Sequence, residues 1–183
     1  MKRIAITGAT GLIGRALCRA LIQRGDEVTV LSRNASTARS LVPDARHYAN
    51  WDYTADSSEI AKVVADKDAV IHLAGAPVAA HSWTPDYKEE IINSRVLSTR
   101  NLVQGMQQND RKPAVFISAS AIGYYGNTFD TEINEESPAA DDFLGKVCAA
   151  WEAEAAQAEP LGIRRVSVRI GIVLSTKDGA LSK

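Results

Sequence analysis

The sequence predicts an α/β fold: a Rossmann-like, doubly wound parallel sheet with helices on both faces. Short apolar runs rich in β-branched residues alternate with segments of helical periodicity along all 183 residues, the pattern of successive βαβ units. Three glycines follow the first predicted strand, where a turn that approaches phosphate needs them. With 45% apolar and 23% charged residues, the chain has the composition of a globular protein that can bury one core.

The elements can be assigned in order along the chain. Apolar residues at helical spacing up to Gly25 predict a first helix over 12–24, because glycine favours the position after a helix end. Pro85 opens the longest helix, 84–106, where its missing N–H costs nothing. Strands are predicted at 3–7, 27–31, 47–51, 69–73, 114–118 and 165–174, further helices at 35–41, 57–65 and 142–158, and loops at 74–84 and 122–137.

Charge and composition exclude several classes of function. With 21 Lys+Arg against 22 Asp+Glu, the chain offers no general electrostatic attraction for nucleic acid or an anionic membrane. No apolar stretch reaches the roughly 18 residues of a membrane span. Cys18 and Cys148 are too few for a disulfide framework or a metal cluster, which fits a reducing compartment. We therefore expect a cytoplasmic protein without nucleic acid, membrane or metal.

The turn Gly8-Ala9-Thr10-Gly11-Leu12-Ile13-Gly14 carries the main functional signal. Its glycines lie where a chain must turn tightly, approach a pyrophosphate and pack a helix close to a strand. The helix that follows presents free N–H groups and a positive dipole end to the phosphates. A ligand-free β-α turn is the alternative, but it would need one glycine and not three. The predicted dinucleotide-binding residues are Gly8, Thr10, Gly11, Leu12, Ile13 and Gly14.

The residues after the second strand favour NADP(H) over NAD(H). A carboxylate there would bind the ribose 2′-hydroxyl, but the chain has Ser32 and Arg33, and an arginine can pair with a 2′-phosphate. The alternative is a solvated surface arginine. Asp52, after the third strand, could accept a hydrogen bond from the adenine amine, or it could be an exposed loop residue.

Further polar and small residues are candidates for the rest of the site. In Leu73-Ala74-Gly75, small residues let the backbone approach the ribose and nicotinamide side of the cofactor, and Ser118 ends the fifth strand. Arg95, in the longest helix, would need an anionic partner if buried, such as a substrate carboxylate or phosphate. A surface salt bridge is its alternative role. His72 lies in an apolar strand and fits a hydrogen-bonded core residue better than a base.

These motifs together resemble a known superfamily, the extended short-chain dehydrogenase/reductases, and within it the nucleotide-sugar epimerases and dehydratases. The motifs are Thr7 to Gly14, Leu73-Ala74-Gly75, Ser118-Ala119-Ser120, Tyr124-Tyr125-Gly126 and Arg169. A narrower set is similar to the atypical epimerase-like branch known as YfcH-type, sometimes labelled SulA-like cell-division proteins. That set is Ser94-Arg95, Ser120 to Gly126, Phe143-Leu144 and Cys148-Ala149-Ala150-Trp151-Glu152.

The resemblance implies a nicotinamide-cofactor Rossmann domain followed by a smaller C-terminal substrate domain. The chain stops at Lys183, directly after the sixth predicted strand. Residues 1–183 are therefore expected to be the NADP(H)-binding domain, an N-terminal fragment of a longer protein without its substrate domain. Relatives often pair through two long helices, here 84–106 and 142–158, so a homodimer is an open expectation.

The resemblance also implies catalytic residues that this chain lacks. Relatives use a tyrosine as acid/base, a lysine four residues later and a hydroxyl residue. One register puts Asp142 and Lys146 at the Tyr and Lys positions, and the other puts Leu144 and Cys148 there. Neither contains the tyrosine. Substitutes near the end of the fifth strand are Ser120, Tyr124 and Tyr125, although aromatic rings at strand ends also serve as packing.

Two functions follow from this reading. The first is an NADP(H)-dependent oxidoreductase or epimerase-like enzyme with a non-standard active site, acting on an unknown small-molecule substrate. The second is a non-catalytic NADP(H)-binding sensor or regulatory module that acts through a protein partner in cell division. Whether bound NADPH is ever oxidised separates the two.

Overall fold

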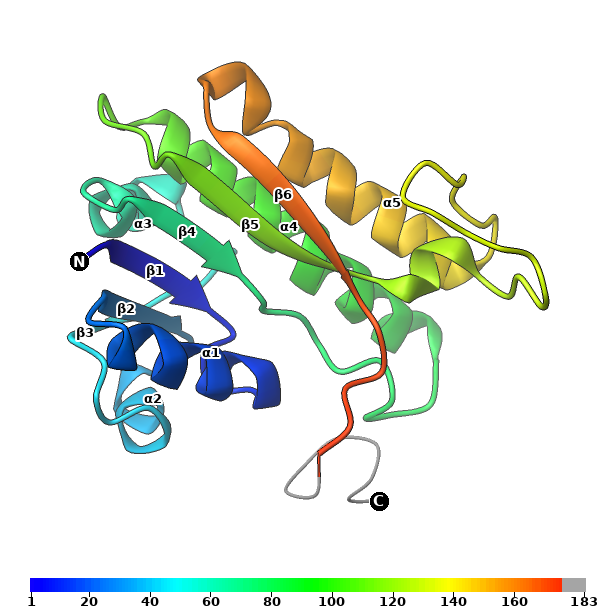
Figure 1. Ribbon diagram of the computed structural model, residues 1–183, viewed down its shortest axis with the longest axis horizontal. Coiled ribbons are helices and arrows are strands. Elements are labelled where there is room, and N and C mark those ends of the chain that lie inside the picture. Colours follow the sequence, from blue (N-terminus) through cyan, green and yellow to red (C-terminus); the bar gives the residue numbers. More distant parts are fainter. Residues whose placement is uncertain (176–183) are drawn as a thin grey trace.

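The structure is a computed structural model that describes residues 1–175, in which a six-stranded parallel sheet has helices on both faces (Figure 1). The strands are β1 (Arg3–Thr7), β2 (Glu27–Ser32), β3 (His47–Asn50), β4 (Ala69–His72), β5 (Val115–Ala121) and β6 (Arg164–Ile170). Their order, β3-β2-β1-β4-β5-β6, is that of a doubly wound dinucleotide-binding fold. The predicted fold class is confirmed. The last eight residues of the predicted domain, 176–183, lie outside the described residues.

Two helical layers enclose the sheet (Figure 1). Helices α1 (Leu12–Gln23) and α2 (Ala35–Leu41) cover one face, and α3 (Ser57–Val64), α4 (Pro85–Gln107) and α5 (Phe143–Ala156) cover the other. Two 3-10 turns, η1 (Ile122–Tyr125) and η2 (Glu159–Leu161), flank α5. Each face has its own apolar core, one around Phe116 and Leu102 and one around Ile6 and Val30.

Polar caps start most of the helices, and α1 is the exception that matters for function. Asn34, Asp56, Thr84 and Asp142 each accept a hydrogen bond from a backbone N–H in the first turn of α2, α3, α4 and α5. These bonds satisfy donors that a helix leaves unpaired. The N-cap of α1 is Gly11, which has no side chain to do so, and the first turn of α1 contains no acid.

The chain reverses its winding direction at β1. This strand pairs with β2 on one side, Ile4 opposite Val28, and with β4 on the other, Ile4 opposite Ala69. The connections from β1 therefore run in opposite directions across the sheet. A crevice opens between them at the carboxyl ends of the strands, which is where ligands bind in doubly wound folds.

Two predicted strand ends were wrong by more than one residue, and both errors have one cause. The strand predicted to end at Ser118 continues to Ala121 because Ala121 pairs with Ile170 of β6. The strand predicted to reach Leu174 ends at Ile170, where β5 has no further residue to offer. The predicted loop 122–137 accordingly begins with the 3-10 turn η1. An apolar run remains a strand only while it has a hydrogen-bonding neighbour.

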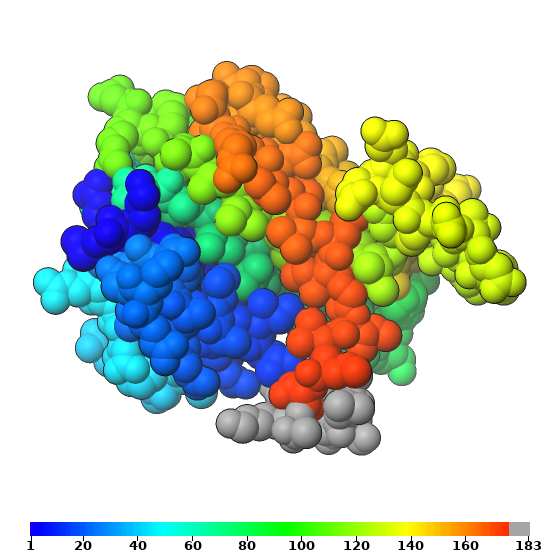
Figure 2. All heavy atoms as spheres, in the orientation of Figure 1, coloured from blue at the N-terminus to red at the C-terminus, as the bar shows by residue number. Residues whose placement is uncertain are grey.

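One face of the sheet is only partly covered by helices. On the α1 side, helices lie in front of β1, β2 and β3, whereas the front of β5 and β6 is open in Figure 1. Side chains alternate along a strand, and Arg169 reaches Glu152 of α5, so Val168 and Ile170 point to the open face. Val168 is 42% exposed. Figure 2 also shows the segment between η1 and α5, in yellow, projecting from the body.

Within residues 1–175, no helix combines the length with the apolar character that a membrane-spanning helix needs.

Candidate functional site

A cavity of about 340 Å³ lies at the carboxyl ends of β1 to β4. Its walls come from segments far apart in the sequence that the fold brings together. Of the residues predicted from the sequence, the walls contain Gly8, Thr10, Gly11, Ser32, Arg33, Leu73, Ala74 and Gly75. They also contain Leu31, Trp51, Tyr53, Ala76, Pro77, Glu90 and Ser94, which the sequence reasoning did not select. The cavity coincides with the crevice at which the winding reverses.

Packing within the protein accounts for two of the three glycines in the first turn. Gly8 has φ +67°, and a Cβ atom there would lie 2.6 Å from the carbonyl carbon of Leu73. A Cβ atom on Gly14 would lie 2.2 Å from the carbonyl oxygen of Gly8. By contrast, a Cβ atom on Gly11 would meet one neighbour, Gly8 O, at an ordinary 3.4 Å. The protein itself does not require glycine at position 11, yet this residue lines the cavity.

The start of α1 lies next to this cavity and has unpaired backbone donors. Leu12 and Ile13 begin the helix directly after the wall residue Gly11. Their N–H groups belong to the first turn, which has no intrahelical acceptors. Since neither a cap side chain nor an acid occupies this end, the positive end of the helix dipole is available to an anion.

Arg33 supplies the cationic side chain at the end of β2. It is exposed and lines the cavity beside Ser32. No carboxylate among residues 1–175 lies within the 4.0 Å of an ion pair with it. The acid in the cavity wall is Glu90, which belongs to α4 rather than to β2.

Asp52 is not part of the cavity lining, whereas its two neighbours are. The Asp52 carboxylate accepts hydrogen bonds from Thr54 N at 2.9 Å and Thr54 Oγ1 at 2.7 Å, and these bonds lower its pKa. Trp51 and Tyr53 form part of the wall, with ring centroids 6.4 Å apart in an edge-to-face arrangement. Trp51 Nε1 donates to Asn101 Oδ1 at 2.9 Å, which fixes its ring. The sequence feature that could have identified Trp51 is an aromatic residue at the carboxyl end of the third strand.

Buried hydrogen bonds fix the floor of the cavity at the end of β4. Thr7 Oγ1 lies 2.6 Å from Nδ1 of His72, and Ser98 Oγ lies 3.0 Å from Nε2. Because the Ser98 hydroxyl donates to Ser94 O at 2.6 Å, it accepts from Nε2–H, and Nδ1 accepts from Thr7. Thr7 Oγ1 in turn accepts from Ala74 N at 3.3 Å. The chain of bonds thus holds the segment Leu73 to Gly75 in place.

His72 has the core position that the sequence favoured over a catalytic one. Its side chain is fully buried. Burial, followed by the nearby charge of Arg95, lowers its pKa from 6.5 to about 3. The imidazole is therefore neutral at physiological pH and serves as a hydrogen-bonding link.

Arg95 and Ser118, two further candidates, are held by hydrogen bonds to backbone carbonyl groups. Arg95 Nη2 donates to Ala76 O and Nη1 to Ile91 O, each at 3.0 Å. A Cβ atom on Gly75 would lie 3.1 Å from Arg95 Cζ, so the guanidinium packs directly against that wall residue. Ser118 is 1% exposed, and its hydroxyl donates to Ala119 O at 3.1 Å. Neither side chain is part of the cavity lining.

The three catalytic candidates meet around one ion pair at the ends of β5 and β6. Arg169 donates to Glu152 from Nε to Oε1 at 2.8 Å and from Nη2 to Oε2 at 2.9 Å. Ser120 Oγ donates to Glu152 Oε1 at 2.6 Å, and Arg169 Nη1 donates to Tyr125 OH at 2.6 Å. The guanidinium carbon lies 3.5 Å from the ring centroid of Tyr124. Burial alone would raise the pKa of Glu152, but the bonds from Arg169 and Ser120 outweigh it and lower that pKa.

Neither register of the expected Tyr–Lys pair gives a catalytic arrangement. Asp142 caps α5, and Lys146 pairs with Asp141, which is 97% exposed. In the other register, Leu144 lies against Gly123. Cys148 is 4% exposed, and burial raises the pKa of its thiol.

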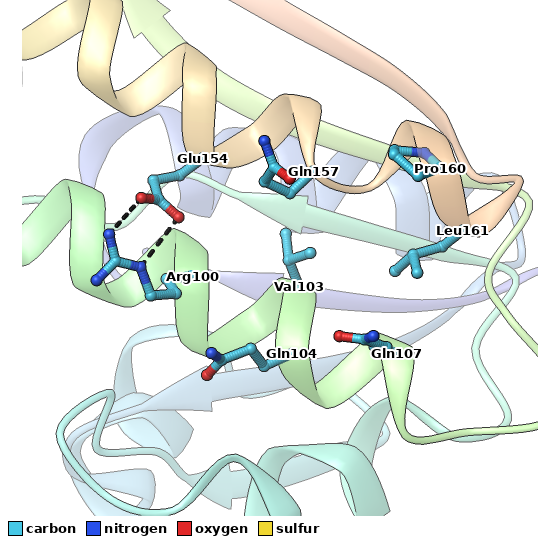
Figure 3. Close-up of a pocket in the computed structure, with 8 residues that line it drawn as sticks. All are labelled: Arg100, Val103, Gln104, Gln107, Glu154, Gln157, Pro160 and Leu161. Carbon is cyan, nitrogen blue, oxygen red and sulfur yellow. Dashed lines mark hydrogen bonds and ion pairs between the residues drawn. The ribbon is translucent and has the colours of Figure 1, made fainter.

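A second cavity, of about 350 Å³, lies away from the strand ends, between α4 and α5 (Figure 3). Val103 and Leu161 point into it, and the paired side chains of Arg100 and Glu154 close one end. The wall is completed by Gln104, Gln107, Gln157 and Pro160. These helices are the ones through which a homodimer was expected, which remains a prediction.

Comparison with known proteins places this geometry in a family. The family model described as NAD dependent epimerase/dehydratase family matches residues 4–182. The chain is 36% identical over 181 residues to the Epimerase family protein SDR39U1 homolog, chloroplastic, of Arabidopsis thaliana, covering 98% of the chain and 51% of that protein. It is also 36% identical over 181 residues to Epimerase family protein YfhF of Bacillus subtilis, covering 97% and 57%.

Solved structures give the same result. The crystal structure of human epimerase family protein SDR39U1 with NADPH matches with a TM-score of 0.82 and 28% identity, over 98% of this chain and 57% of that one. A nucleoside-diphosphate sugar epimerase from Corynebacterium glutamicum matches with a TM-score of 0.80 and 36% identity, over 99% of this chain and 36% of that one. The chain thus spans about half the length of the curated relatives that it matches. It belongs to the NAD-dependent epimerase/dehydratase family, among atypical short-chain dehydrogenase/reductases similar to SDR39U1 and YfhF.

Proposed function

We propose that the chain is the NADP(H)-binding domain of an oxidoreductase or epimerase-like protein of the extended short-chain dehydrogenase type, with a non-standard active site. The observation that carries this proposal is the cavity that brings the glycine turn together with Arg33, a cation without an acid partner at the end of β2 among residues 1–175. The absence of any packing reason for Gly11 adds support, since a ligand phosphate would need that space. A relative of similar fold was crystallised with NADPH.

Residues in the cavity wall and next to it match successive parts of the cofactor. Backbone N–H groups of Leu12 and Ile13 would hold the pyrophosphate. Arg33 and Ser32 would hold the 2′-phosphate. Trp51 would lie against the adenine, and the small residues of Leu73-Ala74-Gly75 would face the ribose on the nicotinamide side. When bound, the nicotinamide supplies a hydride acceptor or donor.

Tyr125 is the candidate that fits proton transfer best. Its phenolic oxygen accepts a bond from Arg169, so its own O–H proton remains free to be donated. The guanidinium also faces the negative charge that this oxygen would acquire. Ser120 gives its proton to Glu152 and can accept a bond from a substrate. Tyr124 packs beneath the guanidinium and would mainly hold Arg169.

Dinucleotide titration tests the proposal. NADPH, NADH, NADP⁺ and NAD⁺ are titrated into the protein and into Arg33→Ala, with binding followed by calorimetry. We expect NADPH to bind in preference to NADH, and Arg33→Ala to weaken NADPH at least tenfold, since a charge-assisted hydrogen bond contributes about 1.5–3 kcal/mol. Arg39→Ala is the control, because that exposed arginine of α2 stacks on Tyr48 outside the cavity wall. Equal NADPH affinity in Arg33→Ala would contradict the NADP(H) assignment.

A non-catalytic NADP(H) sensor is the second candidate, favoured by one observation. The Tyr–Lys pair is missing, and both Ser120 and Tyr125 are bound into the Glu152–Arg169 pair. A sensor would bind NADPH and leave it intact over a broad panel of carbonyl compounds, acting through a protein partner. An enzyme would oxidise it, and Tyr125→Phe would abolish turnover while Tyr124→Phe would retain most of it. This assay needs the protein with the C-terminal part that its relatives have.

A further inference from the structure

Arg95 carries a charge that its surroundings do not explain. The guanidinium is partly buried between α4, the segment after β4 and α5. Its two hydrogen bonds within the protein go to the neutral carbonyl groups of Ile91 and Ala76. No carboxylate of the described residues lies within ion-pair distance. Burial lowers its pKa, which marks the cost of holding a charge there without a counterion.

Arg169 provides the comparison within the same molecule. Its side chain is 17% exposed and forms a bidentate pair with Glu152, so its charge is neutralised by the protein. A guanidinium has five N–H donors, and Arg95 gives one to Ile91 O and one to Ala76 O, which leaves the others for a ligand. These donors form the planar fork that suits a carboxylate or a phosphate.

The neighbouring indole adds a second donor without an acceptor. Trp151 is 5% exposed, and its Nε1 has no hydrogen-bond partner. It is the buried side-chain nitrogen or oxygen left unpaired in the part of the chain that the structure describes. The Arg95 guanidinium carbon lies 5.3 Å from the Trp151 ring centroid. An unpaired buried donor is costly, so both side chains call for an acceptor in the same region.

The position of Arg95 connects it to the cavity. It packs against Gly75 and donates to Ala76, and both of these residues line the cavity, as does its neighbour Ser94. Glycine at position 75 leaves the guanidinium close to the cavity, because a Cβ atom there would lie 3.1 Å from Cζ. This part of the wall comes from the segment after β4 and from α4, whereas Arg33 follows β2.

We propose that Arg95 binds an anionic group of the substrate, a carboxylate or a phosphate, at the cavity wall formed by Gly75 and Ala76. The inference deepens the proposed function and rests on it, since the cavity must also take the cofactor. The substrate is then a small molecule that contains a carboxylate or a phosphate ester as well as its reacting carbon. Neutral alcohols and ketones are poor ligands.

The test uses small anions on the cofactor-loaded protein. Malonate and, separately, inorganic phosphate are titrated by calorimetry into protein saturated with NADPH, so that the cofactor's own phosphate sites are filled. Ionic strength is held constant with potassium chloride, because salt screens charge. We expect millimolar affinity for one or both anions, weakened at least tenfold in Arg95→Gln. Preference for malonate indicates a carboxylate substrate, and preference for phosphate indicates a phosphorylated one.

Two variants control for general effects. Arg100→Gln removes an exposed arginine of the same helix, paired with Glu154, and should leave anion affinity unchanged. Arg95→Lys keeps the charge without the planar fork and should bind malonate about three- to tenfold more weakly. If Arg95→Gln does not fold by circular dichroism, Arg95→Lys decides, and unchanged affinity for both anions in that variant overturns the inference.

Other outcomes separate this inference from the proposed function. Anion affinity that is equal in wild type and Arg95→Gln, or absent in wild type, overturns the anion site. A tenfold loss of NADPH affinity in Arg95→Gln means that Arg95 holds a cofactor phosphate, which also overturns it. If wild type binds no dinucleotide, the proposed function fails. The malonate titration on cofactor-free Arg33→Ala, with and without Arg95→Gln, then still decides the role of Arg95.

Discussion

Two glutamates of α5 form ion pairs that differ in how far they are exposed to water. Glu152, 13% exposed, accepts from both Arg169 and Ser120. Glu154, two residues later in α5, pairs with Arg100, which is 47% exposed. The two glutamate side chains are 13% and 19% exposed, but their arginine partners differ more, at 17% for Arg169 and 47% for Arg100. Depth decides the energy, because water competes for exposed charges and not for buried ones.

We expect Glu152→Gln to lower the free energy of unfolding by about 2 kcal/mol, because it leaves Arg169 partly buried without its counterion. Glu154→Gln should cost under about 1 kcal/mol. Urea denaturation at neutral pH measures both. Equal losses in the two variants would mean that the Glu152–Arg169 pair is no more than a surface salt bridge.

His72 links stability to pH. Its pKa is about 3 in the folded protein against an ordinary 6.5. Below pH 6.5 the unfolded chain therefore binds a proton at this residue, and the folded protein does not. This contribution is present above pH 6.5 and is lost as the pH falls toward 3. Between pH 7 and pH 5, wild type should lose about 2 kcal/mol more than His72→Asn. Parallel urea curves at the two pH values check this, and identical pH dependence in both proteins would rule out a neutral buried imidazole. His47 and His81 remain in both proteins and cancel.

At the scale of elements, the β1–α1 unit combines two kinds of glycine. Gly14 is needed because α1 lies against Gly8, and Gly11 is not. We therefore expect Gly14→Ala to destabilise the fold by several kcal/mol, since its Cβ atom would overlap backbone. Gly11→Ala should leave the melting temperature within a few degrees and weaken NADPH at least tenfold. Thermal unfolding and NADPH titration of both variants separate these effects. Unchanged NADPH affinity in Gly11→Ala would show that this turn does not approach the pyrophosphate.

Elements were predictable from the sequence wherever local signals decide. Glycine after α1, proline at the start of α4 and the β-branched runs of β1 and β2 place these elements within one or two residues of the structure. The ends of β5 and β6 depend on each other, and no local pattern of either segment contains that information. The same holds for η1, which begins where β5 loses its partner strand.

The candidate site was likewise predictable only where the topology decides which residues come together. The wall residues near the glycine turn, the end of β2 and the end of β4 follow from the topology, which the sequence predicted. The hydrogen bonds that join Ser120 to Glu152 and Tyr125 to Arg169 connect residues 32 and 44 positions apart. Trp51 and Glu90 reach the cavity through side-chain orientation, which periodicity does not give.

At the scale of the whole molecule, the open face of β5 and β6 is an apolar surface. Val168 is 42% exposed, and Ile172 and Leu174, which follow β6, are 75% and 64% exposed. We expect this chain to bind the dye ANS, and Val168→Lys to reduce the ANS fluorescence with little change in stability. Leu41→Lys, which changes an apolar residue of α2 that is 43% exposed, should leave the fluorescence unchanged. Equal dye binding in both variants would locate the apolar surface elsewhere.

The central place of β1 in the sheet governs how the chain can fold during synthesis. β1 is made before β4, with which it pairs, and the bond between Thr7 and His72 joins residues 65 positions apart. Closing so long a segment costs chain entropy before its contacts are gained. On the ribosome, β1 has only β2 as a neighbour until β4 emerges, so one edge of this apolar strand stays open to pairing with other chains. Aggregation of nascent chains should therefore be greatest for ribosome-bound lengths that end before β4.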